Sequence, residues 1–463
     1  MLSYFRTTNP YRLLGLLLVI IPFTLPWWID WPGITLPELK SIIVGAKVLE
    51  GFSLYTEIID RTPPLASLFY GLCQWLFGTS LLARHLFAFL ILFLLSAYYA
   101  LLLINKKAFP ENTLVPALVF AVLLTASFDT YALTAELPAF AFLLIALKLL
   151  MDEVEFREQR DENILNLGLS LGTASLFVFT YMFFLPGMVL LLLLFTRLPV
   201  RRLLLLLYGF VLPHGLLTGY FYYNHASADL FERFYRANLL LAEQALMRAQ
   251  DLFLLFAVPL FFLFLSFFVL NRNARLTKYQ SQLLQIMMLW LLLSLIHAWV
   301  AKDLRPQSLL PALPALTFIL THHFLLIKRK FAEFHVWIFL LGTITTAYLA
   351  RYELLPVEHK RLIILPSTPT WSGKRLLDLT ENMNLYVFNL VAPPLTDAVL
   401  AREILQQPDT YESVILINHL FRIDPPDLVL DPANQLGPFI QRIPGLKSRY
   451  ERKDDLWIKN SNN

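Results

Sequence analysis

The sequence predicts a mainly α-helical polytopic membrane protein that ends in a small soluble α/β domain. Of its 463 residues, 57% are hydrophobic and only 16% are charged, whereas soluble proteins carry about 25% charged residues. Apolar runs long enough to cross a bilayer, which takes about 20 residues, recur as far as Arg351. Beyond Arg351 the apolar runs are short and alternate between strand-like and helix-like patterns. We therefore expect a transmembrane domain over residues 1–351 and a soluble domain over residues 352–463.

About eleven segments of the first domain have the composition of spanning helices. They are 13–29, 82–104, 113–130, 135–151, 165–184, 185–197, 203–222, 252–270, 283–300, 308–327 and 334–350. The first leads into "PWWIDWP" and lacks a small-residue cleavage site, so we interpret it as a retained anchor. The pair around Pro186 is the least regular, because its second member is short.

Clusters of Lys and Arg between these runs indicate the orientation, since short cytoplasmic loops are enriched in both residues. With Arg6 and Arg12 inside, the inner loops hold Lys106, Lys107, Arg197, Arg201, Arg202, Arg272, Arg275, Lys278, Lys328, Arg329 and Lys330. The loop 30–81 and everything after Arg351 then lie outside. Eleven spans agree with these loops only if residues 63–78 do not cross the membrane.

Two juxtamembrane helices, joined by a charged turn, are expected in the first outer loop. Residues 36–51, "LPELKSIIVGAKVLEG", place apolar side chains near helical spacing, and Pro37 suits a helix start. This amphipathic helix is expected to rest on the outer membrane surface. Residues 63–78, "PPLASLFYGLCQWLFG", are too few for a typical span, so we expect a helix in the outer interface.

The C-terminal domain is expected to contain a partly parallel sheet. Strand-like runs are "RLIILP", "NLYVFNL", "SVILIN" and "DLVLD", each bounded by turn residues. The intervening runs "GKRLLDLTENM" and "LTDAVLAREILQQ" are expected to be helices. This alternation is typical of a small α/β domain.

Composition also excludes several kinds of site. The net charge of +4 is small and gives no reason to expect nucleic acid as a partner. The lone Cys73 excludes an intramolecular disulfide and a cysteine-based metal cage. The histidines lack metal-ligand spacing with acids, so we expect no metal and no cofactor.

Four stretches of the chain resemble motifs of a known family. They are "LPELKSIIVGAKVLEG", the charged turn with "PPLASLFYGLCQWLFGTSLLARH", "TYALTAELPAFAFLLIALKLL" (130–150) and "KDLRPQSLLPALPAL" (302–316). In order and sidedness they resemble the GT-C membrane glycosyltransferases. The resemblance is strongest to the lipid A aminoarabinose transferases and the bacterial members related to protein O-mannosyltransferases.

This resemblance implies an inverting transfer of a sugar from a polyprenyl-phosphate donor to an envelope glycan, lipid or protein. The partners would be that lipid-linked donor, membrane lipid and the acceptor. The location would be a bacterial-type cytoplasmic (inner) membrane, with the C-terminal domain on the outer, periplasmic face. The resemblance also implies a metal-independent reaction.

The chain departs from the family pattern at two places. Pro37 stands where the family commonly has Asp, which leaves Glu38 as the acid of that pair. The cation before the "PPL" prolines is shifted by a residue or two, to Arg61. A second hypothesis is therefore a non-catalytic GT-C-like scaffold or partner in envelope assembly. A transporter is less favoured, because no pair of interrupted helices repeats across two halves.

Glu38 is the candidate catalytic base, since transfer to a hydroxyl or amine needs a group that takes the acceptor proton. The alternative is an acid in the first helical turn that is favoured only by the helix dipole. Glu57 is a lesser candidate, expected to bind substrate or to be a solvated loop acid.

Arg61 and Arg305 are candidate ligands for the donor phosphate, because a guanidinium presents a planar fork of N–H donors. Asp60 would orient Arg61, or simply pair with it at the surface. Arg305 could instead snorkel to the interface. Glu136 begins a span, where an acid usually has a partner or a function. It is expected to position the sugar or acceptor, or else to face water.

Overall fold

The computed structural model describes residues 1–155, 160–196, 198–240, 245–273, 276–301, 303–359, 361–364, 371–380 and 383–460. Arg197, Arg275 and Lys302 lie outside these residues. The chain divides into two compact units. Unit 1 comprises 1–32, 81–216 and 243–362, and unit 2 comprises 33–80, 217–242 and 363–463. The expected boundary between residues 351 and 352 did not anticipate that the first outer loop groups with the C-terminal residues.

Unit 1 is a bundle of helices. Its elements are α1 (Leu2–Phe5), η1 (Pro10–Leu14), α2 (Gly15–Ile29), α5 (Leu81–Asn105), α6 (Val115–Leu124), η2 (Phe128–Tyr131), α7 (Glu136–Glu155), α8 (Asp161–Phe177), η3 (Phe179–Phe183), α9 (Phe184–Phe195), α10 (Val200–Tyr223), α13 (Ala249–Leu255), α14 (Ala257–Asn273), α15 (Lys278–Ala301), η5 (Pro306–Ala312), α16 (Leu313–Leu326) and α17 (Arg329–Arg351). The last turns of α10, from Leu217, belong to unit 2.

A helix is present within each of the eleven predicted spans. Among the described residues, five helices are long and apolar enough to cross a membrane: Leu81–Asn105, Val200–Tyr223, Lys278–Ala301, Pro306–Leu326 and Arg329–Arg351. The pair α13 and α14, bent by 71°, would make a sixth. The chain therefore has the helices of a multi-pass membrane protein, and the count of about eleven spans stays a prediction.

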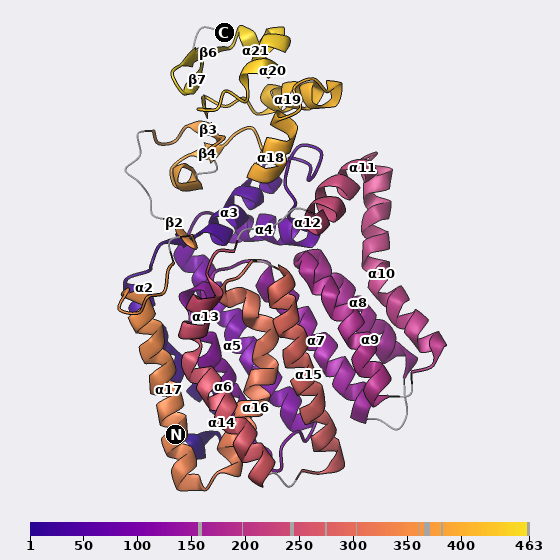
Figure 1. Cartoon of the computed structure of the whole chain (residues 1–463), viewed down its shortest axis with the longest axis vertical. Helices are drawn as coiled ribbons and strands as arrows, with labels where there is room; N and C mark the ends of the chain where they lie inside the picture. The colour runs from indigo at the N-terminus through magenta and orange to yellow at the C-terminus, as the bar shows by residue number, and fades with distance from the viewer. Residues whose placement is uncertain are drawn as a thin grey trace. The chain divides into compact units, whose positions relative to one another are not determined.

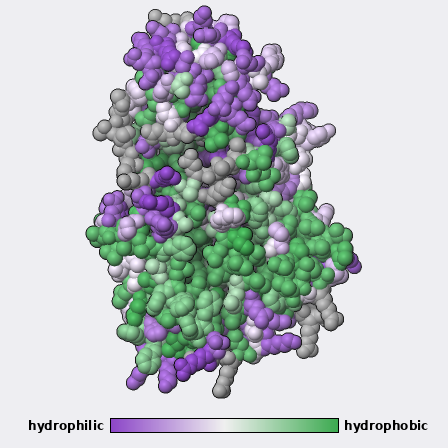
Figure 2. Space-filling model, in the orientation of Figure 1, coloured by the Kyte–Doolittle hydropathy of each residue, from purple (hydrophilic) through white to green (hydrophobic). Residues whose placement is uncertain are grey.

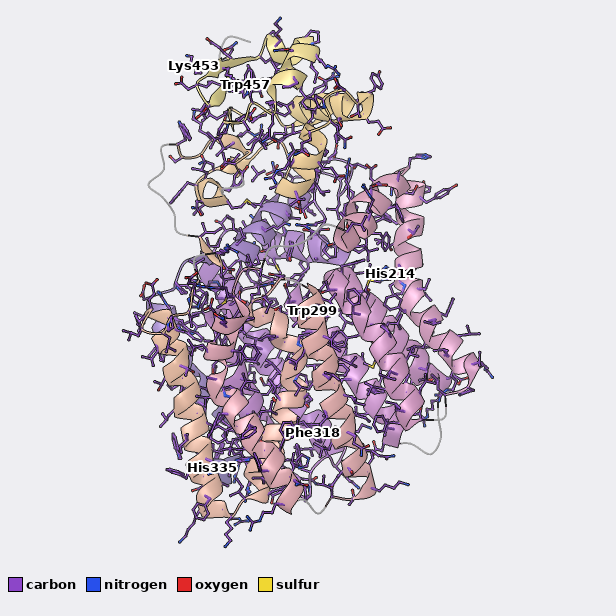
Figure 3. The ribbon with its side chains drawn as sticks, viewed as in Figure 1. His214, Trp299, Phe318, His335, Lys453 and Trp457 are labelled. Atoms are coloured by element: carbon purple, nitrogen blue, oxygen red, sulfur yellow. The ribbon has the colours of Figure 1, made fainter. Side chains whose placement is uncertain are left out.

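The helices of unit 1 differ in how much of their surface is covered. Every residue of α6 is buried, as are the residues of α16 from Leu313 to Phe324. In Figure 1, α14, α15, α16 and α17 run side by side, so α16 has neighbours on several sides. Phe318 of α16 is therefore buried, whereas Trp299 of α15 is exposed (Figure 3). An apolar side chain that faces outward from such a bundle is expected of a protein surrounded by lipid.

Figure 2 shows apolar side chains gathered over the helices of unit 1. Polar side chains gather at the end of this unit where the chain turns between α14 and α15 and between α16 and α17. Arg272 lies in the last turn of α14, and Lys328, Arg329 and Lys330 lie at the start of α17; all four belong to the predicted inner clusters. The separation of apolar and cationic surface is the pattern on which the predicted orientation depends.

Unit 2 combines helices with two small sheets. Its elements are β1 (Ile34–Thr35), α3 (Leu36–Leu49), α4 (Pro64–Phe77), α11 (Ser227–Leu230), η4 (Phe231–Arg236), α12 (Ala237–Leu240), β2 (Ile363–Ile364), β3 (Arg375–Asp378), η6 (Met383–Val387), β4 (Leu390–Val391), α18 (Ala398–Leu405), α19 (Tyr411–Ile423), β5 (Leu428–Leu430), α20 (Gly437–Arg442), α21 (Pro444–Lys447), β6 (Tyr450–Lys453) and β7 (Leu456–Lys459). Strand β1 pairs antiparallel with β2.

The two helices predicted in the first outer loop are present as α3 and α4. Helix α3 starts where expected, because Thr35 caps its N-terminus and Pro37 fits the first turn. The two helices pack closely at Gly45, where a Cβ would lie 2.4 Å from the Tyr70 carbonyl oxygen. Cys73 of α4 is buried.

The larger sheet has the strand order β4-β3-β5-β7-β6. Strand β3 pairs parallel with β4 and β5, and β7 pairs antiparallel with β5 and β6. The predicted partly parallel sheet is therefore confirmed, with "DLVLD" as β5 and "LTDAVLAREILQQ" as α18.

Three local predictions for this region are wrong. "GKRLLDLTENM" contains strand β3, because Leu376 and Leu377 are buried between two neighbouring strands. "SVILIN" lies inside α19, whose buried residues Ser413, Ile417, Leu420 and Phe421 follow helical spacing. "NLYVFNL" is mostly the 3-10 turn η6, and only its last residue enters β4. Short apolar runs do not distinguish a strand from a buried helix.

Candidate functional site

Buried charges of unit 1 gather around Arg305, which is 1% exposed. The Arg305 cluster consists of Asp129, Glu136, Asp303, Arg305 and Gln307. Arg305 donates from Nε to Asp303 at 3.1 Å and from Nη1 to Asp129 at 3.3 Å. It also donates from Nη1 to Gln307 Oε1 at 2.6 Å and pairs with Glu136 through Nη2. The structure thus brings together Glu136 and Arg305, which the sequence selected separately.

Local backbone structure holds the Arg305 cluster in place. Asp129 lies in η2, beyond the end of α6, and accepts from the backbone N–H of Gln307 at 2.9 Å. Gln307 in turn donates from its side chain to the carbonyl of Ala132 at 2.9 Å. The start of η5 is therefore attached to the 129–132 segment. Arg305 is buried and paired, so it does not snorkel to a surface.

The Arg305 cluster contains more carboxylates than cations among the described residues. Three carboxylates face one guanidinium. A buried group of this kind can accept hydroxyl donors or a proton more readily than it can bind another anion.

A second cluster of buried charges lies in unit 2. The Asp397 cluster consists of Lys40, Asp60, Arg61 and Asp397. The Oδ2 of Asp397 accepts from Arg61 Nε at 2.7 Å and from Lys40 Nζ at 3.4 Å. Lys40 also lies 3.8 Å from Asp60 Oδ1. The predicted residues Asp60 and Arg61 are therefore together, but Arg61 bonds a carboxylate that the sequence did not suggest.

The electrostatics of the Asp397 cluster favour its ionised form. Burial alone would raise the pKa of Asp397, but Lys40 and Arg61 outweigh burial and hold it below its ordinary value. Asp60 is fully buried and accepts from the backbone N–H of Thr62 at 2.7 Å. The cluster thus holds two cations and two anions, of which Lys40 is partly exposed and the other three are buried.

Glu38 and Glu57 occupy different surroundings in unit 2. Glu38 lies in the first turn of α3 and is fully buried, with its N–H donating to Thr35 Oγ1 at 3.4 Å. Glu57 accepts from the backbone N–H of Ser53 at 2.7 Å and lies 4.0 Å from His419. Its carboxylate thus closes the turn that follows α3.

Sequence reasoning missed Lys40 and Asp397. Lys40 follows the selected Glu38 by two residues, so its place on the same amphipathic helix was an available signal. Asp397 follows Thr396 directly before α18, which is the pattern of a helix N-cap. That pattern predicts the cap but gives no hint of a cation partner.

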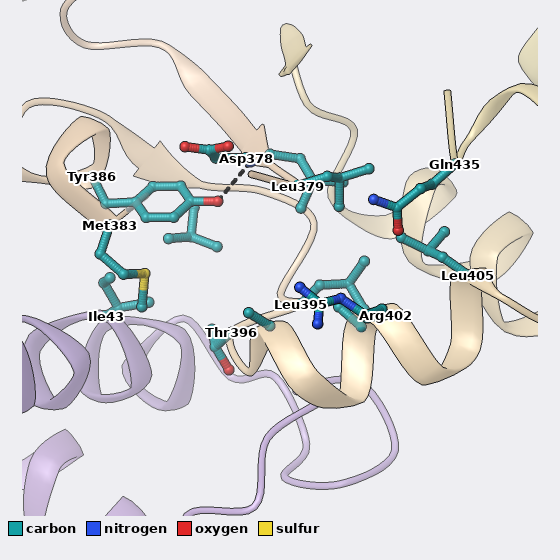
Figure 4. A pocket seen from close by; sticks show the side chains of 14 residues that line it. Ile43, Asp378, Leu379, Met383, Tyr386, Leu395, Thr396, Arg402, Leu405 and Gln435 are labelled. Carbon is teal, nitrogen blue, oxygen red and sulfur yellow. Dashed lines mark hydrogen bonds between the residues drawn. The ribbon is translucent and has the colours of Figure 1, made fainter. Parts of the chain in front are cut away.

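None of the predicted site residues lines either of two cavities in the described part of the chain, although Thr396, which lines the first, donates to Asp60. A hollow of about 30 Å³ in unit 2, room for about one water molecule, lies between β3, η6 and α18 (Figure 4). There the Tyr386 hydroxyl accepts from the Asp378 N–H at 2.7 Å. A cavity of about 450 Å³ in unit 1 is lined by residues 248–254 and 353–359. Within the described ranges, no group of three or more His, Cys, Asp or Glu is arranged to hold a metal.

Known proteins offer only a distant comparison. No protein-family model matches the sequence, and no curated protein sequence matches it. Two solved structures of ArnT from Cupriavidus metallidurans are similar to the chain, each with a TM-score of 0.46 over 93% of it. The undecaprenyl-phosphate complex is 14% identical and covered over 89% of its length, and the apo form 13% and 88%. At these identities no residue of the chain takes a role from ArnT.

Proposed function

We propose that the chain transfers a sugar from a polyprenyl-phosphate donor to an envelope glycan, lipid or protein at the outer face of the membrane. The observation that carries this proposal is the position of Lys40 and Arg61. Both cations are held in the Asp397 cluster, and Arg61 lies three residues before α4 begins at Pro64. A lipid phosphate needs fixed cations for its head group beside apolar surface for its tail.

Helix α4 supplies the apolar surface. Leu68, Leu72, Trp75 and Leu76 are exposed and recur at helical spacing, so they form one stripe. The opposite face, with Ala66, Ser67, Gly71 and Cys73, is buried. An exposed stripe of this kind fits an interfacial helix whose outward face meets acyl chains.

In the proposed reaction an acceptor O–H or N–H attacks C1 of the donor sugar. The new bond forms as the bond between C1 and the phosphate oxygen breaks, with inversion at C1, and the polyprenyl phosphate leaves with the electron pair. Glu38 would take the acceptor proton. Arg61 would stabilise the charge that develops on the departing phosphate.

Other selected residues would bind substrate in this proposal. Glu136 would accept hydrogen bonds from hydroxyl groups of the sugar or acceptor, and Arg305 would hold that carboxylate. A direct phosphate contact by Arg305 would need the exchange of contacts that it already makes to three carboxylates. Asp60 would keep the turn before α4 in shape, and Glu57 would close the turn after α3.

The test is to purify the full chain with its native lipids and identify any bound polyprenyl-phosphate sugar by mass spectrometry. Binding of undecaprenyl phosphate to the purified chain is then compared between the wild type and Arg61→Ala. The proposal expects a bound lipid-linked sugar and weaker binding by Arg61→Ala. The proposal would be contradicted if the wild type carried no bound lipid-linked sugar and also had no affinity for undecaprenyl phosphate.

A second candidate is a non-catalytic scaffold in envelope assembly. The full burial of Glu38 favours it, since a catalytic base must reach the acceptor proton. Full complementation of a deletion strain by Glu38→Gln, together with failure of a chain truncated after Arg351, would favour the scaffold over the enzyme.

A further inference from the structure

Asp397 makes contacts of two different kinds. It is the N-cap of α18, and its Oδ1 accepts from the N–H groups of Val399 and Leu400 at 3.0 and 3.2 Å. Its Oδ2 accepts from Arg61 and Lys40. The side chain is 2% exposed. One carboxylate thus joins a helix of the C-terminal region to two cations of the first outer loop.

The backbone around Asp397 holds the same segment of the loop. Ile59 donates its N–H to the carbonyl of Pro394 at 2.9 Å, and Asp397 donates its N–H to the carbonyl of Ile59 at 3.2 Å. The hydroxyl of Thr396 donates to Asp60 Oδ2 at 2.7 Å. Residues 59–61 are therefore attached on one side to residues 394–397. This attachment holds in place the backbone from which Arg61 reaches Asp397.

We propose that Asp397 is a positioning residue that sets the orientation of Arg61 and Lys40 for an anionic lipid phosphate. This inference rests on the proposed function, because it takes the phosphate of the lipid donor as the ligand of these cations. Asp397 does not touch the ligand. It engages Nε of Arg61, and a guanidinium whose plane is fixed loses less conformational entropy when it binds an oxyanion.

Positioning and simple charge predict opposite effects of removing the Asp397 charge. By Coulomb's law, the loss of a carboxylate beside two cations should strengthen the binding of an anion. If Asp397 orients the cations, its loss should weaken that binding. Asp397→Asn separates the two, because Asn still caps a helix and nearly keeps the side-chain volume.

The experiment measures binding of undecaprenyl phosphate to the purified full chain in detergent micelles. The expected result for Asp397→Asn is a loss of affinity of about tenfold, which corresponds to one charge-assisted contact. Asp431→Asn is the matched control. Asp431 is also fully buried in unit 2 and also accepts two backbone N–H bonds, from Gln435 and Leu436 at 2.8 and 2.9 Å. Its affinity should stay within about twofold of the wild type.

A double variant tests whether Asp397 acts through Arg61. In an Arg61→Ala background, Asp397→Asn should change the affinity by less than about threefold, because Arg61, the more closely held of the two cations that it orients, is absent. Asp397→Glu keeps the charge and should recover part of the loss. An effect of full size in the Arg61→Ala background would assign Asp397 a merely structural role and overturn the proposal.

A second substitution tests the positioning role if the Asp397→Asn variant does not fold. Thr396→Val keeps the volume and removes only the hydroxyl that donates to Asp60. It should weaken undecaprenyl phosphate binding in the same direction by a smaller factor. Unchanged affinity in both variants would overturn the positioning role while leaving the proposed function in place. Tighter binding by Asp397→Asn would also overturn the positioning role and leave the proposed function in place. No binding by the wild type would overturn both.

Discussion

The Nε of Arg61 donates a hydrogen bond of 2.7 Å to Asp397, which lies 336 residues further along the chain. A second contact across unit 2 accompanies it. Lys47 of α3, which is also buried, lies 2.7 Å from Asp424 at the end of α19. Ion pairs at Asp397 and at Asp424 therefore join the first outer loop to the C-terminal residues. This explains why the two segments form one compact unit.

The ion pair of Lys47 and Asp424 should contribute to the stability of unit 2. Lys47→Ala would leave the buried carboxylate of Asp424 with Arg375, which lies 2.5 Å from it, as its remaining cation. We expect a loss of up to roughly 3 kcal/mol in the free energy of unfolding, since the buried carboxylate then keeps the partly exposed Arg375 in place of two cations. Chemical denaturation followed by fluorescence measures it, with the exposed Lys453→Ala as control. Equal effects of the two substitutions would contradict this assignment.

The positive charges of the loops predict which segments share a side of the membrane. Residues 105–112 are expected inside and the segment after Arg351 outside. Single cysteines introduced as Lys107→Cys and Ser372→Cys should react with a membrane-impermeant reagent from opposite sides of sealed vesicles. The native Cys73 is buried and should give little background. Labelling of both positions from one side would remove an odd number of spans from the predicted topology.

Local signals were enough to predict parts of this structure. Helix α3 could be placed because Pro37 and the helical spacing of apolar residues are both visible within sixteen residues of sequence. Glu136 and Arg305 could each be selected, because a charge at the edge of an apolar run is unusual. Their pairing could not, since 169 residues separate them. Asp397 could not be selected, because its sequence context is that of an ordinary helix N-cap. Its contact with Arg61 forms only in the folded chain, where two distant segments meet. The "SVILIN" run failed for a different reason, because a short apolar run is compatible with a strand and with a buried helix.

The substitution Glu38→Gln separates the enzyme from the scaffold. If Glu38 is the base, replacing its carboxylate with an amide of the same size removes the proton acceptor, and transfer should fall by roughly 10²- to 10⁴-fold. Binding of undecaprenyl phosphate should change little, because the proposed phosphate contacts belong to Arg61 and Lys40. Arg305→Ala should instead weaken binding of the sugar-bearing donor, since it removes the cation that holds Glu136 and that three carboxylates share. The two variants should therefore differ when a turnover assay is run beside a donor-binding assay.

If Glu38→Gln transfers sugar at the wild-type rate, the buried carboxylate is only an acid in the first turn of α3, and the base must be sought elsewhere. If no protein, wild type or variant, turns over any lipid-linked sugar while the full chain is still required in the cell, the scaffold is the better account of these residues.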